Sequence, residues 1–519
     1  MPFPTLSELA AKSVAQGIHD ESISLNFTLN TKSSNSIVRE LLKLDGNNFK
    51  KLEVFKNQLP VTKIDLRLCD IDADAVRNLS NFNLVSLDFG ELTQLEDDFP
   101  VDPSDDGTLD IVSLLTQSTN PYSRNSMIHL GLSSDREFIA GWETKVSQML
   151  PNLRSIDNSC VYVDTVQFSN LCTCFPNLLV LDISNVISLS SLQGIKNIKN
   201  LQKLTMFNVD FDYIEGYKEL SELKNLKYLD VSCNQYRRDE LSSIRLMLAA
   251  GVRMEALEFF DCSRTYVTEQ ELRTFVKNHP SLKTVVAMGT ACDQTTISGV
   301  KVLNMASMSS LSESLEYAIL NDRFDLALHF IQEVFEKLKT NRENLADAQL
   351  HHIKNAVLFV LREPLDEYIK FKWIGGMTVD QDFKLLTLKY YLESGIFEHE
   401  LSTSMFSTDI PDLIKLFYNV FNRHPLTSWQ KEHAGLIFQM FEATVNAVRP
   451  GILIPDRVLH FVFEMTVDLV YQFPEHRTQG TRIIHQALVW MTWEQLLRMS
   501  FNFELVTKVN MFLPSTFVF

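Results

Sequence analysis

Cysteines, histidines and clustered carboxylates are the residues of this chain most able to do chemistry, and their spacing decides what they could do. Cys172 and Cys174 form a lone Cys-x-Cys pair, whereas structural zinc sites use four ligands in paired spacings. His351 and His352 are adjacent, so on a helix they point about 100° apart and do not easily share a metal. The sequence therefore predicts no metal site.

An acidic segment, ELTQLEDDFPVDPSDDGTLDI, occupies residues 91–111. Its aspartates lack the alternating spacing and the closing glutamate of a calcium-binding loop. We interpret this segment as a solvated surface loop.

Catalytic motifs are missing from the sequence. It contains no Gly-rich phosphate loop, no HExxH, no GxSxG and no CxxC pair. We expect a chain without catalytic residues or cofactors. The alternative, a hydrolase within the C-terminal half, would need an acid, a base and a nucleophile that converge in one pocket.

The composition limits the classes of partner. The chain has 519 residues, 45% of them hydrophobic and 22% charged, with a formal net charge of −17. So acidic a protein is not expected to bind nucleic acid or an anionic membrane, because both need a basic face. No secretory signal and no apolar run of about 18 residues is present, and the odd number of cysteines favours a reducing compartment. We expect a cytoplasmic or nuclear protein.

A repeat of the form LxxLxLxxN runs through the N-terminal half. Its clearest copy is LKYLDVSCN, in which Leu226, Leu229 and Val231 lead to Asn234. From residue 153 onward the copies begin at Leu153, Leu178, Leu201, Leu226, Met254 and Leu282, which gives steps of 25, 23, 25, 28 and 28 residues. These steps fall in the range of leucine-rich repeats, roughly 20–29 residues. Each LxxLxL predicts a short strand, and segments such as 216–223 and 268–280 predict helices between strands. Stacked repeats bury a core that no single repeat could form.

After residue 305 the apolar residues recur at helical spacing. Phe324, Ala327, Leu328 and Ile331 form one such stripe, and prolines such as Pro455 and Pro474 separate the later helices. Many of these segments are apolar on more than one face, as in the inner helices of a layered array. We predict an α/β leucine-rich-repeat solenoid over residues 51–300, followed by an all-α armadillo/HEAT-like helical solenoid over residues 305–519.

The N-terminal 50 residues predict helices of another kind. In TLSELAAKSV, Thr5 and Glu8 have the spacing of a capping box, while Leu6, Ala10 and Val14 recur at one-turn spacing. This half-apolar helix could shield the first repeat or could dock into a groove of another protein. If it is a shield, Leu6 is buried by the chain itself.

The spacing of Thr5, Leu6, Ala10 and Val14 resembles the Elongin-C-binding box, in which the Leu fills an apolar pocket and a small residue lets the helix approach closely. Such a box, followed by leucine-rich repeats and armadillo-like helices, resembles the Zyg-eleven/Zer-one family of substrate receptors of Cullin-2 ubiquitin ligases. The resemblance implies that residues 1–50 hold the Elongin-C and cullin boxes. Ile37 and Leu41 would take the last two apolar positions of the cullin box, although Ser33 and Ser34 replace its first apolar residue and proline.

The family also reads N-terminal degrons that begin with Gly, using a Trp and acidic side chains of its helical domain. Trp490 and Glu494, in ALVWMTWEQL, resemble the first half of that site. The alternative is that Trp490 is a core residue of an apolar helix.

The resemblance therefore implies a non-catalytic substrate-recognition subunit. Its expected partners are Elongin-B/C, Cullin-2 and protein substrates. The alternative is a leucine-rich-repeat scaffold that binds proteins outside any ligase.

Overall fold

The structure is a computed structural model of the chain. It describes residues 6–92, 108–134, 136–186, 188–233, 242–321, 428–446 and 456–490, except 68 and 70, and scattered positions between them (95, 98, 99, 323, 326, 327, 330, 331, 387, 389–395, 397 and 414). Over these residues the chain forms two compact units, divided after Ser314.

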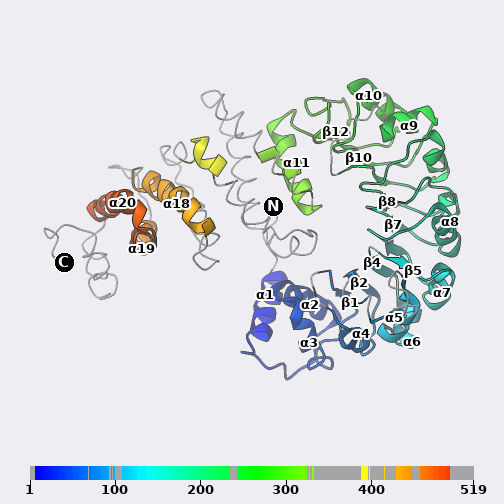
Figure 1. Cartoon of the computed structure of the whole chain (residues 1–519), viewed down its shortest axis with the longest axis horizontal. Coiled ribbons are helices and arrows are strands. Elements are labelled where there is room, and N and C mark those ends of the chain that lie inside the picture. The colour runs from blue at the N-terminus through cyan, green and yellow to red at the C-terminus, as the bar shows by residue number, and fades with distance from the viewer. Residues whose placement is uncertain are drawn as a thin grey trace. The chain divides into compact units, whose positions relative to one another are not determined.

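Ten parallel strands form the sheet of the first unit, and each pairs with the next in sequence order. The strands are β1 (Lys63–Asp65), β2 (Ser86–Glu91), β4 (His129–Ser133), β6 (Ser155–Asp157), β7 (Val180–Asp182), β8 (Lys203–Thr205), β9 (Tyr228–Asp230), β10 (Phe259–Asp261), β11 (Thr284–Val286) and β12 (Lys301–Leu303). Figure 1 shows them stacked along the inner side of a curved array. This confirms the leucine-rich-repeat solenoid.

One column of apolar side chains joins the strands. The residues paired in this column across the first nine of the ten strands are Ile64, Leu87, Leu130, Ile156, Leu181, Leu204, Leu229, Phe260 and Val285. All of them are at most 2% exposed. Because side chains alternate along a strand, the residues on either side of this column face the opposite surface of the sheet.

The chain turns sharply after each strand. Three residues beyond the strand ends, Cys160, Asn185, Asn208 and Arg264 have positive φ values between 58° and 62°. The backbone N–H groups of these residues donate to carbonyls of the next repeat, as Asn185 does to Phe207 over 2.7 Å. The turns therefore extend the hydrogen bonding between repeats beyond the short strands.

Helices and 3-10 turns cover the outer side of the sheet, as Figure 1 shows for α7 to α10. They are α4 (Ala73–Leu79), α5 (Ile111–Ser118), α6 (Pro121–Ser126), α7 (Trp142–Met149), α8 (Thr165–Cys174), η3 (Ile195–Asn197), η4 (Ile214–Gly216), η5 (Lys218–Glu222), α9 (Ser243–Ala249) and α10 (Glu269–Asn278). The helix predicted over 268–280 is confirmed, whereas 216–223 forms 3-10 turns.

The repeat predicted to begin at Met254 has a different register. Phe260, not Leu257, pairs with Leu229, so Leu257 takes the place that Leu226 has one repeat earlier. Met254, Leu257 and Phe260 are all buried, so the apolar pattern alone allowed either alignment. Phe259, expected in the core, instead lies on the opposite face of the sheet and is partly exposed.

The sheet also extends one strand further than predicted, to β12. The helix α11 (Met308–Leu320) begins directly beyond it. Asn304 is fully buried and donates to the carbonyls of Cys292 and Thr295 over 2.9 and 2.8 Å. Ser310 of α11 donates to the carbonyl of Val302 over 2.8 Å. These bonds close this end of the array.

The acidic insertion is packed at its ends. In it, β3 (Thr108–Leu109) pairs with β5 (Glu137–Phe138) in a small second sheet, and Leu95 and Phe99 are buried. Apolar residues within the insertion therefore fold against the first unit, although its composition predicts a solvated loop.

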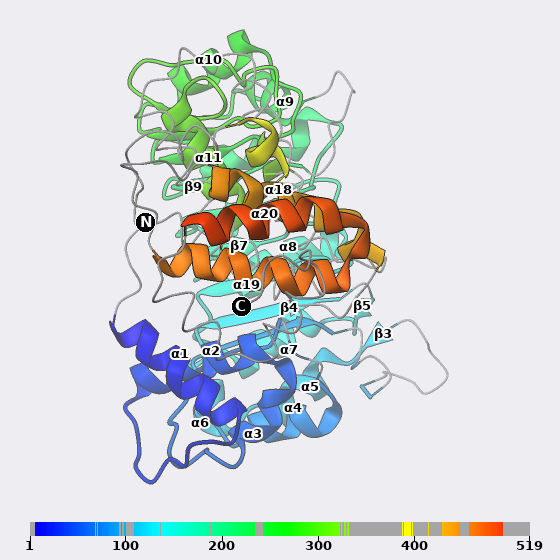
Figure 2. The same ribbon diagram turned by 90° about the vertical axis from the view of Figure 1, so that its left-hand side faces the viewer.

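The second unit is helical over the residues described. Its long helices are α18 (Ser428–Asn446), α19 (Asp456–Gln472) and α20 (Arg477–Trp490), with η7 (Pro474–His476) between the last two. These three helices pack against one another, and Figure 2 shows α19 and α20 side by side. As predicted, α19 begins directly after Pro455, and a break at Pro474 precedes α20.

Leu204→Ala tests the buried column. The side chain is fully buried, so its truncation should lower the free energy of unfolding by about 2–5 kcal/mol. Thermal and urea unfolding measure this loss. Tyr213→Ala is the control, since Tyr213 is 71% exposed and its loss should change the stability by no more than about 0.5 kcal/mol. Equal effects of the two substitutions would contradict the assignment of Leu204 to the core.

Candidate functional site

Two surfaces of the first unit are candidates for function: the N-terminal helix pair and the inner face of the sheet. The pair consists of α1 (Leu6–His19) and α2 (Thr31–Leu44), followed by η1 (Gly46–Asn48) and α3 (Phe49–Leu52). The helices α1 and α2 pack against each other, and α2 packs against β1.

Helix α2 closes the open edge of the sheet. Asn35 accepts hydrogen bonds at Oδ1 from the backbone N–H groups of Thr62 and Lys63, over 2.9 and 3.2 Å, and donates from Nδ2 to the hydroxyl of Thr62. An uncovered edge strand would leave such donors open to pairing with another chain. The shield of the first repeat is therefore α2.

Helix α1 has one buried and one exposed face. Ala11, Ala15 and Ile18 are at most 5% exposed and pack inward. Leu9 is 50% exposed, and Ala10 is also exposed. The outer face of α1 is therefore open to solvent, and the sheet edge is covered by α2 instead.

The residues of the predicted Elongin-C box fall on this helix with different surroundings. Thr5 lies outside the described residues, and Leu6 begins α1, with its side chain outside the description. Ala10 is exposed one turn later, and Val14 is partly buried against the core.

The side chains of Ile37 and Leu41 do not face a partner, contrary to the expectation for the cullin box. They are 4% and 0% exposed and belong to the core of the first unit. The physical reason is that they form the apolar stripe with which α2 covers the end of the array. The solvent-facing residues of this helix include Lys32, Arg39 and Leu44.

Trp490 is the last described residue of α20. Its side chain is 39% exposed, so the alternative of a buried core residue is wrong. Glu494 lies outside the described residues.

The inner face of the sheet carries a column of mostly polar residues, each directly after the buried apolar residue of its strand, which was not predicted from the sequence. In pairing order these are Asp65, Asp88, Gly131, Asp157, Asp182, Thr205, Asp230 and Asp261. The sequence held a signal for this column: an aspartate recurs directly after a buried leucine, as in LDIS and LDVS.

These aspartates also form the turns. Asp157 and Asp182 accept at Oδ1 from the backbone N–H groups of Ser159 and Ser184, over 3.1 and 2.9 Å. Asp230 and Asp261 do the same with the serines two residues ahead of them, Ser232 and Ser263. Such Asx turns explain why aspartate recurs where the strand stops.

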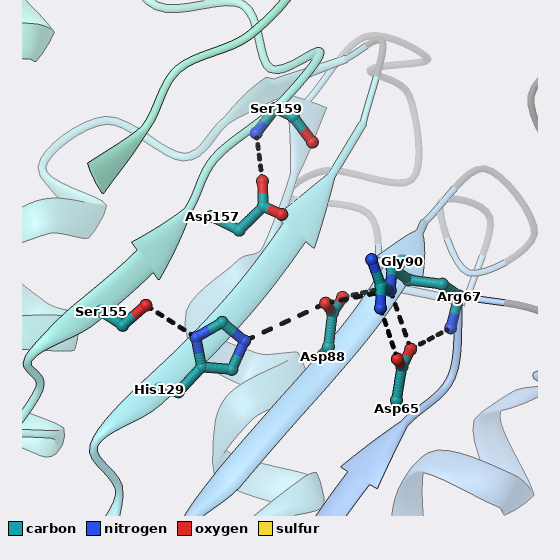
Figure 3. A network of polar contacts seen from close by, with 8 residues as sticks. All are labelled: Asp65, Arg67, Asp88, Gly90, His129, Ser155, Asp157 and Ser159. Atoms are coloured by element: carbon teal, nitrogen blue, oxygen red, sulfur yellow. Dashed lines mark hydrogen bonds and ion pairs between the residues drawn. The ribbon is translucent and has the colours of Figure 1, made fainter. Parts of the chain in front are cut away.

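Arg67 and His129 contact the first aspartates of the column, as Figure 3 shows. Arg67 donates to Asp65 over 2.6 Å, and its Nε lies 3.4 Å from Oδ2 of Asp88. His129 Nε2 lies 4.0 Å from the same oxygen. Burial alone would raise the pKa of Asp88, but His129, Arg67 and the N–H of Gly90 together hold that pKa below its usual value.

Ser155, His129 and Asp88 superficially resemble a hydrolytic triad. His129 Nδ1 lies 2.9 Å from the hydroxyl of Ser155, but the distance from Nε2 to the carboxylate, 4.0 Å, is beyond hydrogen bonding. In a triad the aspartate orients the imidazole directly, whereas Asp88 is held by Gly90 and Arg67. The sheet register alone brings these three residues together, and we interpret them as a network that links strands.

Among the described residues, neither of the next two aspartates forms an ion pair with a cationic side chain, and the more distant charge of Arg67 offsets only part of the rise in the pKa of Asp157. Burial, and then the charge of Asp88, raise the pKa of Asp157. Burial, and then the charge of Asp157, raise the pKa of Asp182 to about 7. Asp157 and Asp182 pair across β6 and β7, so their carboxylates repel each other when both are ionised.

Within the described part of the chain, no group of three or more His, Cys, Asp or Glu side chains could hold a metal ion. Among the same residues, none of the helices is both long and apolar enough for a membrane span.

The pKa of Asp182 predicts a pH dependence of stability. A carboxyl group whose pKa is raised on folding stabilises the folded state only while it is protonated, so its contribution falls as the pH rises from about 4 to about 7. The melting temperature of Asp182→Asn, relative to that of the wild type, should therefore rise between pH 5 and pH 8. The same change at the exposed Asp212 should leave the wild-type profile unaltered. Parallel profiles for wild type and Asp182→Asn would contradict the prediction.

Gly131 leaves room for the Asp88 carboxylate. A Cβ atom at Gly131 would lie 2.4 Å from Cγ of Asp88 and would force that side chain away from Gly90 and Arg67. Gly131→Ala should therefore lower the free energy of unfolding by about 1–3 kcal/mol, as measured by urea unfolding. In α18, a Cβ at Gly435 meets nothing closer than 3.4 Å, so Gly435→Ala should be neutral or stabilising. A neutral Gly131→Ala would show that Asp88 can move without cost.

The repeats match a known family. Residues 169–306 match the family model described as "Zer-1-like, Leucine-rich repeats". The chain is 29% identical over 319 residues to Gastrulation-defective protein 3 of Caenorhabditis elegans, across 60% of this chain and 44% of the relative. The matched region thus spans less than half the length of that relative. The matches support the resemblance to the Zyg-eleven/Zer-one family.

A solved structure with a partial likeness is an internalin, InlF, of Listeria monocytogenes. It has a TM-score of 0.28 and 14% sequence identity, over 60% of this chain and 94% of the internalin.

Proposed function

From the premise that residues 169–306 are Zer-1-like leucine-rich repeats, we propose that this chain is a substrate-recognition subunit of a ubiquitin ligase that contains Cullin-2 and Elongin-B/C. In this proposal it catalyses nothing. It binds a protein substrate and holds it near the catalytic subunits of the ligase, in the cytoplasm or nucleus.

The open outer face of α1 is the observation that carries the proposal. A helix used only as a shield would be covered on its apolar side and polar elsewhere, yet α1 exposes Leu9 and Ala10 while α2 covers the sheet edge. A helix that docks into a groove needs apolar anchors at one-turn spacing. Leu6 and Ala10 have that spacing.

Contacts with the segments that follow α1 fix the C-terminal end of this helix in place. His19 lies within hydrogen-bonding distance of the Asn48 side chain, 3.1 Å to Oδ1, and the carbonyl of His19 accepts from Lys51 Nζ over 2.7 Å. A Cβ at Gly17 would approach Ile23 to 3.0 Å, so the loop after α1 packs closely on the helix. A helix that is already ordered loses little conformational entropy when it binds.

For Cullin-2 we propose the exposed side of α2, with Lys32, Arg39 and Leu44, in place of Ile37 and Leu41. For substrates, the half-exposed Trp490 at the end of α20 supports a contact with N-terminal degrons. A large aromatic side chain left partly in solvent is the type of residue that dominates binding interfaces.

Co-purification with Elongin-B/C tests the proposal. The wild type should capture Elongin-B/C, and Leu6→Ser should remove an anchor worth about 2–4 kcal/mol. At a factor of ten for each 1.4 kcal/mol, the affinity should fall by about 30- to 700-fold.

Ala10→Leu gives a sharper test, because Ala10 is exposed and its replacement leaves the core intact. The larger side chain should keep α1 from approaching its partner and should reduce capture at least tenfold. The control is Lys12→Leu, which adds the same side chain at an exposed position on another side of the helix. If the wild type captures no Elongin-B/C, the chain is better described as an interaction scaffold outside the ligase.

A further inference from the structure

The inner face of the sheet has a second feature that the proposed function does not use. At β1 and β2, Arg67 forms ion pairs with Asp65 and Asp88, and His129 of β4 lies 4.0 Å from Asp88. Among the residues described, Asp157 and Asp182 form no ion pair with a cationic side chain. Lys203 of β8 lies 4.7 Å from the centre of the Tyr228 ring, so its ammonium group contacts a side chain of β9.

In each of these two carboxylates, the Oδ2 atom can accept a hydrogen bond from a ligand. The turn serines occupy Oδ1 of Asp157 and of Asp182. Both residues are partly exposed, and neither Oδ2 atom is buried without a partner. Strands in a sheet lie about 4.8 Å apart, a separation that one ammonium or guanidinium group can bridge.

Thr205 provides an independent observation that points to a ligand on this face. It pairs with Asp182 on one side and with Asp230 on the other, so its side chain lies on the same face as theirs. The residue is only 8% exposed, yet its hydroxyl has no hydrogen-bonding partner within the described part of the chain. A buried unpaired hydroxyl costs about 1–3 kcal/mol, and a ligand that bonds to it would remove that cost.

We propose that Asp157, Asp182 and Thr205 form a site that binds a lysine or arginine side chain, carried by an extended segment of a partner protein. The two carboxylates pair with the cation, and the Thr205 hydroxyl accepts one of its N–H groups. Further along the same face, Tyr228 and Phe259 stack with their ring centres 4.6 Å apart, next to the path of such a segment.

A cationic side chain fits this site better than a metal ion. The described residues contain no set of three metal-ligating carboxylates, imidazoles or thiols, and hard cations such as calcium require six to eight oxygen ligands. Burial first, and then the charges of neighbouring aspartates, raise the pKa values of Asp157 and Asp182, and a bound cation would offset the second effect. The site does not depend on Elongin-B/C, so the proposal stands or falls separately from the ligase.

Fluorescence anisotropy with a fluorescein-labelled octalysine peptide tests the site on the full chain. Asp157→Asn/Asp182→Asn keeps the turn acceptors and should weaken peptide binding at least tenfold. The control Asp212→Asn/Glu215→Gln removes the same two charges from exposed positions outside the sheet and should change binding less than twofold. Equal losses in the two double variants would show diffuse attraction to an acidic protein and would overturn the proposal.

Two further measurements keep the test decisive. If the double variant does not fold, Thr205→Val replaces it. Valine has nearly the same shape as threonine, so this variant should melt no lower than the wild type. It should weaken octalysine binding at least threefold. Unchanged binding by Thr205→Val would overturn the proposal. So would displacement of the peptide by millimolar calcium or magnesium chloride at matched ionic strength, because the site would then be one for divalent cations.

Discussion

The sheet of the first unit depends on one constraint: the middle residue of every strand must be apolar and must align with its neighbours. Most of the strands are only three residues long, too short to be stable alone. The column that runs through Leu181, Leu204 and Leu229 is what makes successive strands a continuous core. A repeat that lost its alignment would expose two apolar surfaces, its own and that of the next repeat.

This constraint determines where polar groups can lie. With the middle position committed to the core, the flanking positions face the inner surface, and there Asp157 and Asp182 arise side by side. The same residues end the strands through their Asx turns, so the acidic face is a by-product of how the turns are made. Where a carboxylate is paired, as Asp88 is with Arg67, the charge is absorbed within the sheet. Asp157 and Asp182, which form no such ion pair among the described residues, are partly exposed.

Much of the fold could be predicted from the sequence, because strand periodicity is strict. The register near Met254 could not be, since three apolar residues at spacings of three allow two alignments. The inward direction of Ile37 and Leu41 was also missed: an amphipathic helix shows that one face is buried, but not whether its own chain or a partner buries it. The aspartate column needed the pairing of strands that are 20 or more residues apart, which a single repeat does not reveal.

The bonds of Asn35 to the backbone of β1 have a consequence for how the chain can be divided. The helix that carries these bonds, α2, also packs against α1, so α1 and the repeat array form one folding unit. A fragment that begins at the first repeat would expose the N–H groups of Thr62 and Lys63 as an open edge. Such an edge recruits other strands. Removal of the N-terminal helices would therefore leave a repeat array that aggregates through its open edge strand.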